Sequence, residues 1–131
     1  MGAQKKPRLE HNILSFRFVH EIGIAQDILA QVLNGAEKQN ARSIHRIKLR
    51  IGDLSGVAED ALRFALEVGV RDTIAQDAII CMEQIKALCY CSTCEETFEP
   101  EDIIFLCPHC GTLSSKILRG RELEVSELEI T

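Results

Sequence analysis

The chain has 131 residues, of which 46% are hydrophobic and 27% are charged. This length accommodates one compact domain, or one domain with a small metal-stabilised module, and it excludes a multidomain enzyme. Fifteen basic and twenty acidic residues give a net charge of −5, which argues against a protein that binds nucleic acid through a positive surface. No apolar run approaches the ~18 residues of a membrane span, so no membrane partner is expected.

The first 18 residues differ in charge from the rest of the chain. Four basic residues stand there against Glu10, so the net charge is +3 in residues 1–18 and −8 in residues 19–131. The apolar residues of this segment are too interrupted for a secretory signal, and Lys6 stands where a myristoylation signal needs Ser or Thr. We therefore expect a cytoplasmic protein.

The next segments alternate between helical and strand periodicity. Residues 21–39 place apolar side chains three or four positions apart, which predicts an amphipathic helix on a core. Residues 44–51 alternate strictly and predict a half-buried strand. One face carries Ile47, Leu49 and Ile51. The other face carries Arg46, Lys48 and Arg50. The basic face could meet an acidic partner, but a solvated face is the simpler interpretation.

A turn and a second helix follow. The run Gly52-Asp53-Leu54-Ser55-Gly56 ends the strand, and we interpret it as a turn because no catalytic constellation accompanies Asp53 or Ser55. The second helix is predicted to extend to about Asp72. Its predicted inner stripe consists of Ala58, Ala61, Leu62, Ala65 and Gly69.

Two further strands complete the pattern. Residues 78–87 are rich in β-forming residues, and residues 122–130 alternate with a change of phase after Val125 that predicts a bulge. The fold class is therefore α+β, a small α/β layer domain of two helices on a three-stranded mixed sheet, with an inserted, zinc-ribbon-like domain built on four cysteines. We expect the α/β domain to comprise residues 19–87 and 117–131, and the inserted domain residues 88–116.

All six cysteines lie within thirty residues, which suggests a metal site and not a disulfide framework. Two C-x-x-C pairs can supply a closed tetrahedral site of four sulfur ligands, which is suited to structural zinc. Their ligands are Cys91, Cys94, Cys107 and Cys110. Iron in a rubredoxin-like site and redox-active dithiols are the alternatives. Glu95 stands where such metal knuckles often carry glycine.

Three neighbouring residues have simpler interpretations. Cys89 could compete as a ligand or lie beside the site, and Cys81 is expected to pack in its strand as a small apolar residue. His109 is expected to be solvated. His20, by itself, is typical of a capping or surface group at a helix start.

Several motifs together resemble the HypA/HybF family of nickel metallochaperones for [NiFe]-hydrogenase maturation. They are His20-Glu21-Ile22, the run from Ile51 to Val57 with the helix after it, the paired C-x-x-C, and Gly120-Arg121-Glu122-Leu123. The similarity covers residues 19–131, with the motifs in the family's order.

The resemblance implies zinc at the four paired cysteines and nickel at Val19, His20 and Glu21. In the family, a terminal amine, backbone nitrogens and an imidazole hold the nickel, and this nitrogen field suits Ni(II). It also implies carriage and not catalysis, so the protein is expected not to be an enzyme. The implied partners are a nickel-handling maturation GTPase, a hydrogenase large-subunit precursor and, in some organisms, urease maturation proteins.

The sequence departs from the family at its beginning, because 18 residues precede Val19. One hypothesis is that translation starts at Val19 and that residues 1–18 are not native. If the extension is present, nickel has to rely on His20, Glu21 and backbone groups, and we expect weaker binding.

A zinc-ribbon adaptor for transcription or protein interaction, without nickel, is the alternative function. The loop between the cysteine pairs argues against nucleic acid because it is acidic. Its acidic residues are Glu95, Glu96, Glu99, Glu101 and Asp102. A rubredoxin-like electron carrier would differ visibly, because its iron centre is coloured.

Overall fold

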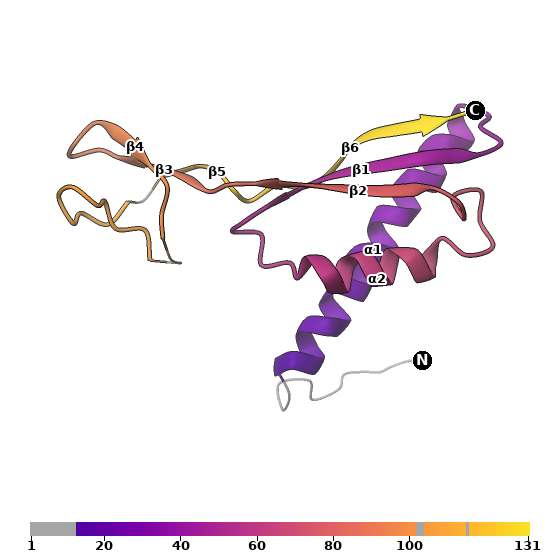
Figure 1. The fold of residues 1–131 in the computed structure, drawn as a ribbon, viewed down its shortest axis with the longest axis horizontal. Coiled ribbons are helices and arrows are strands. Elements are labelled where there is room, and N and C mark those ends of the chain that lie inside the picture. Colours follow the sequence, from indigo (N-terminus) through magenta and orange to yellow (C-terminus); the bar gives the residue numbers. More distant parts are fainter. Residues whose placement is uncertain (1–12, 102–103, 115) are drawn as a thin grey trace.

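The computed structural model describes residues 13–101, 104–114 and 116–131 (Figure 1). Residues 1–12 of the expected extension and Asp102 of the acidic loop lie outside the described residues. Within the described part, no helix combines the length and apolar character needed to cross a membrane. The elements, in order, are α1 (Ile13–Lys38), β1 (Ile44–Gly52), α2 (Glu59–Gly69), β2 (Ile79–Ile85), β3 (Leu88–Cys91), β4 (Glu96–Phe98), β5 (Lys116–Arg119) and β6 (Leu123–Ile130).

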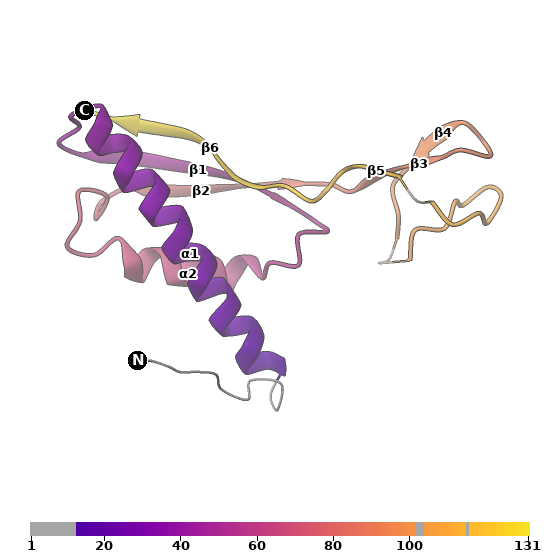
Figure 2. The ribbon, with the colours of Figure 1, turned by 180° about the vertical axis from the view of Figure 1, so that it is seen from behind.

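The larger part of the molecule is a three-stranded sheet with two helices on one face. The strand order is β2-β1-β6, with β1 parallel to β2 and antiparallel to β6. The helix α2 connects β1 to β2, which makes a βαβ unit. Both helices lie on the same side of the sheet in the two opposite views (Figures 1 and 2). The predicted mixed sheet with two helices is confirmed.

The core lies between β1 and the helices. Ile47, Leu49 and Ile51 are buried beneath Val32 of α1 and Leu66 of α2, within one continuous apolar cluster. The alternation of residues 44–51 is therefore confirmed, because burial of one face of a strand requires a period of two.

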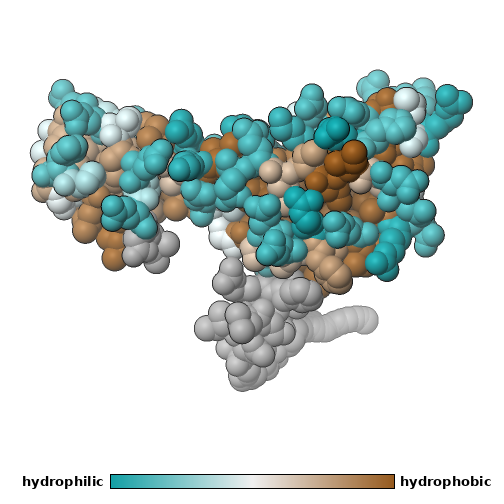
Figure 3. All heavy atoms as spheres, viewed as in Figure 1, coloured by the Kyte–Doolittle hydropathy of each residue, from teal (hydrophilic) through white to brown (hydrophobic). Residues whose placement is uncertain are grey.

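The opposite face of the sheet carries ion pairs. Arg50 contacts Glu124 at 2.8 Å, and Arg46 contacts Glu129 at 3.2 Å. Hydrophilic residues line the upper edge of the space-filling view, on the side away from the helices (Figure 3). Neighbouring carboxylates thus neutralise the basic face of β1, which favours the simpler interpretation of this surface.

The change of phase in the last strand is a β-bulge. Lys48 pairs with Glu127 while Leu49 pairs with Val125, so Ser126 is the extra residue. The Ser126 hydroxyl donates a hydrogen bond to the Lys48 carbonyl at 3.3 Å. The bulge returns Leu128 to the core side after Val125, as predicted.

The helix boundaries differ from the prediction. The first helix begins at Ile13 and not at residue 21, because neither glycine nor proline interrupts residues 13–20 and each added residue extends an existing helix by one hydrogen bond. The second helix ends at Gly69, and its fully buried residues are Leu62 and Leu66. The predicted inner stripe was wrong in omitting Leu66, because the small residues on that stripe partly face α1 and not the sheet.

The smaller part is a second sheet of order β4-β3-β5, with both pairings antiparallel. Its core is a separate cluster around Cys89, Cys91, Phe98 and Cys107. Its short strands were not predicted individually, because three or four residues are too few to show periodicity. The inserted cysteine domain of the predicted fold class is confirmed.

The loop after β1 holds the two chain segments that join the sheets. The Asp53 amide donates to the Ile85 carbonyl at 2.9 Å, and the Leu54 amide donates to the Gly120 carbonyl at 2.6 Å. A side chain at Gly52 would lie 2.0 Å from the Gly120 oxygen, so no other residue fits there without a shift of the backbone. The run from Gly52 to Gly56 is therefore a structural junction.

Candidate metal centre

Two similar turns present the four paired cysteines. In the first, the Glu95 amide donates to the Cys91 carbonyl at 2.7 Å, and in the second the Gly111 amide donates to the Cys107 carbonyl at 2.9 Å. Glu95 and Gly111 have φ values of 57° and 74°, so the glutamate adopts the left-handed conformation that glycine takes in the second turn. The chain thus forms the same turn with and without glycine.

The four sulfur atoms converge on one point. All lie within 4.8 Å of one another, with 3.6 Å between Cys91 and Cys110 and 3.9 Å between Cys94 and Cys107. A tetrahedron with Zn–S bonds of ~2.3 Å has edges of about 3.8 Å. The cluster therefore fits a four-coordinate zinc ion without rearrangement of these pairs. Because four protein ligands fill such a site, no position remains for a reactive water.

Backbone amides point to two sulfurs of this cluster, and the pKa values of the other two thiols shift in opposite directions. The Cys94 amide points to the Cys91 sulfur, and the His109 amide points to the Cys107 sulfur, each at 3.4 Å. Hydrogen bonding by the Thr112 hydroxyl lowers the pKa of Cys110 to about 6, while hydrogen bonding with Cys110, together with burial, raises the pKa of Cys94 to about 12. One cysteine is therefore ready to bind a cation at neutral pH, and a divalent ion deprotonates the others.

The remaining residues near the cysteine pairs lie outside the sulfur cluster. Cys89 is fully buried opposite Phe98 in the small sheet, so it lies beside the site and does not complete it. His109 is exposed, with its ring 3.8 Å from the Glu96 carboxylate. The prediction for Cys81 was incomplete, because its half-buried thiol accepts a hydrogen bond from the Arg46 guanidinium at 3.0 Å.

The predicted nickel residues lie inside α1, two turns after its start. Interior helical amides donate to carbonyls four residues earlier, so the amides of residues 19–21 are already hydrogen-bonded in this conformation. His20 is exposed, whereas Glu21 is only 1% exposed. The side chain of Val19 lies outside the described environments. The helix therefore does not bring His20 and Glu21 together on one face.

Glu21 instead contacts the beginning of α2. One of its carboxylate oxygens accepts a hydrogen bond from the Ala58 amide at 2.6 Å, while the other has no partner among the described residues. Ala58 is the N-cap of α2 and has no oxygen of its own to cap the helix. Glu21, from another helix, accepts instead from the amide of Ala58 itself, which is one of the unpaired amides at the start of α2 and lies close to the positive end of its dipole.

Sequence reasoning missed this contact, as it missed the role of Thr112. The available signal was an uncapped helix start, because Ala58 stands where Ser, Thr, Asp or Asn is usual. An uncapped start indicates that an acceptor must come from elsewhere. It does not say which of the distant carboxylates provides it.

The fold and the sulfur cluster together define a class: a small α+β protein in which a βαβ domain carries an inserted tetrathiolate metal module. Residues 19–130 match the family described as "Hydrogenase/urease nickel incorporation, metallochaperone, hypA". The chain belongs to the HypA family.

Curated relatives and solved structures agree with this assignment. The hydrogenase maturation factor HypA of Picosynechococcus sp. is 39% identical over 112 residues, which cover 86% of this chain and 99% of that protein. The Chloroflexus aggregans factor of the same name is 37% identical, over 85% and 98% of the two chains. The solution structure of the Ni metallochaperone HypA from Helicobacter pylori matches with a TM-score of 0.61 and 24% identity, over 84% of this chain and 96% of that one, and shows the shared fold.

Proposed function

We propose that the protein binds Ni(II) and delivers it during maturation of a [NiFe]-hydrogenase, with a structural zinc ion in the cysteine module. The family match over residues 19–130 carries this proposal. Two of the sulfur–sulfur distances, 3.6 and 3.9 Å, are close to the edge of a tetrahedral zinc site with four sulfur ligands, which supports zinc as the resident metal. The proposed activity is carriage, so no residue is assigned a catalytic role.

The proposed division of labour follows the two parts of the chain. Residues 19–87 and 117–131 form the nickel-binding domain, and residues 88–116 form the zinc-binding domain. Zinc is held by Cys91, Cys94, Cys107 and Cys110, and nickel is held at Val19, His20 and Glu21. Among the described residues the cysteines form no disulfide, and four of them cluster as metal ligands do, which favours action in the reducing cytoplasm.

The proposed partners are those that handle nickel before and after this protein. A nickel-handling maturation GTPase and a hydrogenase large-subunit precursor are proposed first. Urease maturation proteins follow, because the family description names urease as well as hydrogenase.

Nickel binding at these residues requires a change at the start of α1. Amide nitrogens must lose their protons to bind Ni(II), and in α1 they donate hydrogen bonds instead. A chain that begins at residue 19 would supply a free amine and would lack the preceding helical turns. We therefore expect such a chain to bind Ni(II) more tightly than the chain with residues 1–18, and intact-mass measurement on protein from the native gene decides which form is produced.

The decisive test is metal analysis of the purified protein with one equivalent of Ni(II), for the unaltered chain, His20→Ala and His45→Ala. His45 is the control because it is also exposed but lies on β1, where it contacts the Thr131 hydroxyl. We expect one zinc ion per chain in all three proteins, and one nickel ion that only His20→Ala loses. If zinc is bound without nickel, or if nickel binding is unchanged in His20→Ala, the zinc-ribbon adaptor remains as the function.

A further inference from the structure

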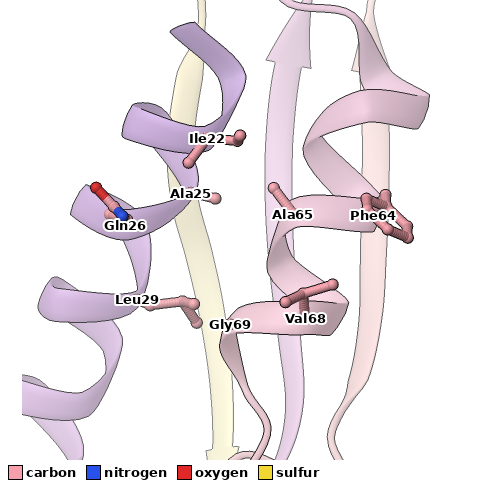
Figure 4. Close-up of a pocket in the computed structure, with 8 residues that line it drawn as sticks. All are labelled: Ile22, Ala25, Gln26, Leu29, Phe64, Ala65, Val68 and Gly69. Atoms are coloured by element: carbon pink, nitrogen blue, oxygen red, sulfur yellow. The ribbon is translucent and has the colours of Figure 1, made fainter. Parts of the chain in front are cut away.

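A groove between α1 and α2 remains open on the helical side of the domain. Its volume is about 220 Å³, and Gln26 is the polar residue among those that line it. Figure 4 shows the two helices side by side, with Ile22, Ala25 and Leu29 of α1 directed towards α2. The α2 wall consists of Phe64, Ala65, Val68 and Gly69.

Exposed apolar residues mark the outer wall of this groove. Phe64 is 57% exposed and Val68 is 41% exposed, one helical turn apart. Neither is needed to cover the sheet, since Leu62 and Leu66 of the same helix already do so. Adjacent exposed apolar residues of this kind are typical of an interaction surface, and aromatic residues are enriched at such surfaces.

Two acidic residues lie on α2 beside the exposed apolar residues of the groove. Asp60 lies one turn before Phe64 on the same stripe of α2, and Glu67 lies one turn after Phe64. Asp60 and Glu67 are both exposed. Among the described residues, neither makes an ion pair, whereas Glu59 of the same helix pairs with Arg63. Of the described residues that line the groove, none is basic. A partner with basic residues around apolar anchors would therefore match both the apolar groove and the acidic residues beside it.

We propose that the groove between α1 and α2 docks an amphipathic helix of a partner protein whose apolar anchors are flanked by lysine or arginine. A helix suits the site because it packs between the ridges of two neighbouring helices. From Ile22 to Leu29 the groove extends about 10 Å along α1, which corresponds to two turns of the docked helix. Two or three anchors fit this length.

The docked helix would leave His20 accessible. Each residue advances a helix by about 100°, so Ile22, Gln26 and Leu29 lie on roughly the opposite side of α1 from His20. The groove therefore lies on the side of α1 away from His20, whereas the buried Glu21 lies one turn before Ala25, which lines the groove. A protein held there can remain bound while a second one approaches His20.

The test uses two synthetic 18-residue helical peptides and the full chain. Both peptides carry leucine at positions i, i+4 and i+7; one has lysine beside these positions and the other has glutamate. Fluorescence anisotropy at low salt should show the lysine peptide binding at least tenfold more tightly, with the difference shrinking as salt is added. Equal binding of the two peptides, or no binding of the lysine peptide, would overturn the proposal.

Variants locate the binding. Phe64→Ser should weaken binding of the lysine peptide about tenfold or more. The matched control is Ile79→Thr on β2, where the original side chain is 56% exposed, and it should bind as the unaltered chain does. Glu67→Lys should weaken binding of the lysine peptide and strengthen binding of the glutamate peptide. A folding defect would weaken binding of both peptides, so this variant distinguishes the two explanations.

Two further outcomes complete the test. His20→Ala should bind the lysine peptide normally, so the result does not depend on whether nickel binds. Sedimentation of the free protein is measured in parallel, because self-association abolished by Phe64→Ser would assign the groove to a second copy of the chain and overturn the proposal. Peptide binding unaffected by Phe64→Ser would do the same.

Discussion

Glu21 is a buried carboxylate that closes the start of a helix distant in sequence. Its hydrogen bond with the Ala58 amide, at 2.6 Å, links α1 to α2. The proposed nickel role and this structural role meet in one residue. If substitution of Glu21 abolishes nickel binding, the stability of the variant must also be measured, because the substitution removes a structural contact as well.

Glu21→Ala should destabilise the nickel-free protein by about 1–3 kcal/mol, because it leaves the half-buried Ala58 amide at the start of α2 without an acceptor. Urea unfolding monitored by circular dichroism checks this. Asp27→Ala is the control, since Asp27 is exposed on the same helix and should change stability little. Equal stability of both variants would contradict the capping role of Glu21.

The cysteines outside the sulfur cluster should differ in reactivity. Burial raises the pKa of the Cys89 thiol, and its side chain has no exposed surface. Cys81 is half-buried, so reagents reach its sulfur more readily. Iodoacetamide treatment of the zinc-loaded protein, followed by peptide mass spectrometry, should therefore label Cys81 first and leave Cys89 unmodified. Faster labelling of Cys89 would show that the small core opens readily.

At the scale of elements, the junction loop after β1 decides how the two sheets are joined. A Cβ atom at Gly52 would lie 2.0 Å from the Gly120 oxygen, and the atom it would strike is backbone. The same two glycines belong to motifs that carry the family resemblance. Their role is therefore explained by close packing of chain segments and not by chemistry.

Gly52→Ala should lower the free energy of unfolding by about 3 kcal/mol, because the backbone of β1 and the Gly120 segment must separate. Gly35→Ala is the matched control: Gly35 lies within α1 with open space around it, so alanine should stabilise the protein by up to about 1 kcal/mol. Thermal unfolding of both variants measures the contrast. A stable Gly52→Ala protein would mean that the junction can spread without cost.

At the scale of the whole molecule, two apolar clusters of unequal size share one chain. The larger cluster spans both helices and the first sheet, whereas the smaller has four buried residues, three of them cysteines. So small a core contributes little to folding, and bound metal has to supply most of the stability of the module.

Removal of zinc with a strong chelator should therefore unfold the cysteine module and leave the larger domain folded. In ¹H–¹⁵N NMR spectra, the dispersed amide signals of β3, β4 and β5 should collapse while those of β1 and α2 persist. Added zinc should restore them. Loss of the β1 signals together with those of β3 would show that the two parts fold as one unit.

The sequence by itself determined the strand periodicity, the bulge and the four cysteines that form the sulfur cluster. The alternation that buries Ile47, Leu49 and Ile51 is a local property of an extended chain, and the change of phase after Val125 registers the extra residue Ser126. The paired C-x-x-C spacing predicted the sulfur cluster because a tight turn fixes both members of each pair. The length of α1 was not predicted, since residues 13–20 precede the part of the helix that covers the core.

Only the tertiary structure decided which distant residues meet. The contact of Glu21 with Ala58, the approach of Gly52 to Gly120, and the groove between α1 and α2 each join segments that no local pattern connects. Periodicity reports which face of an element is buried, but it does not report the neighbour against which that face packs. The neighbours are fixed only when the helices settle on the sheet and the apolar core closes.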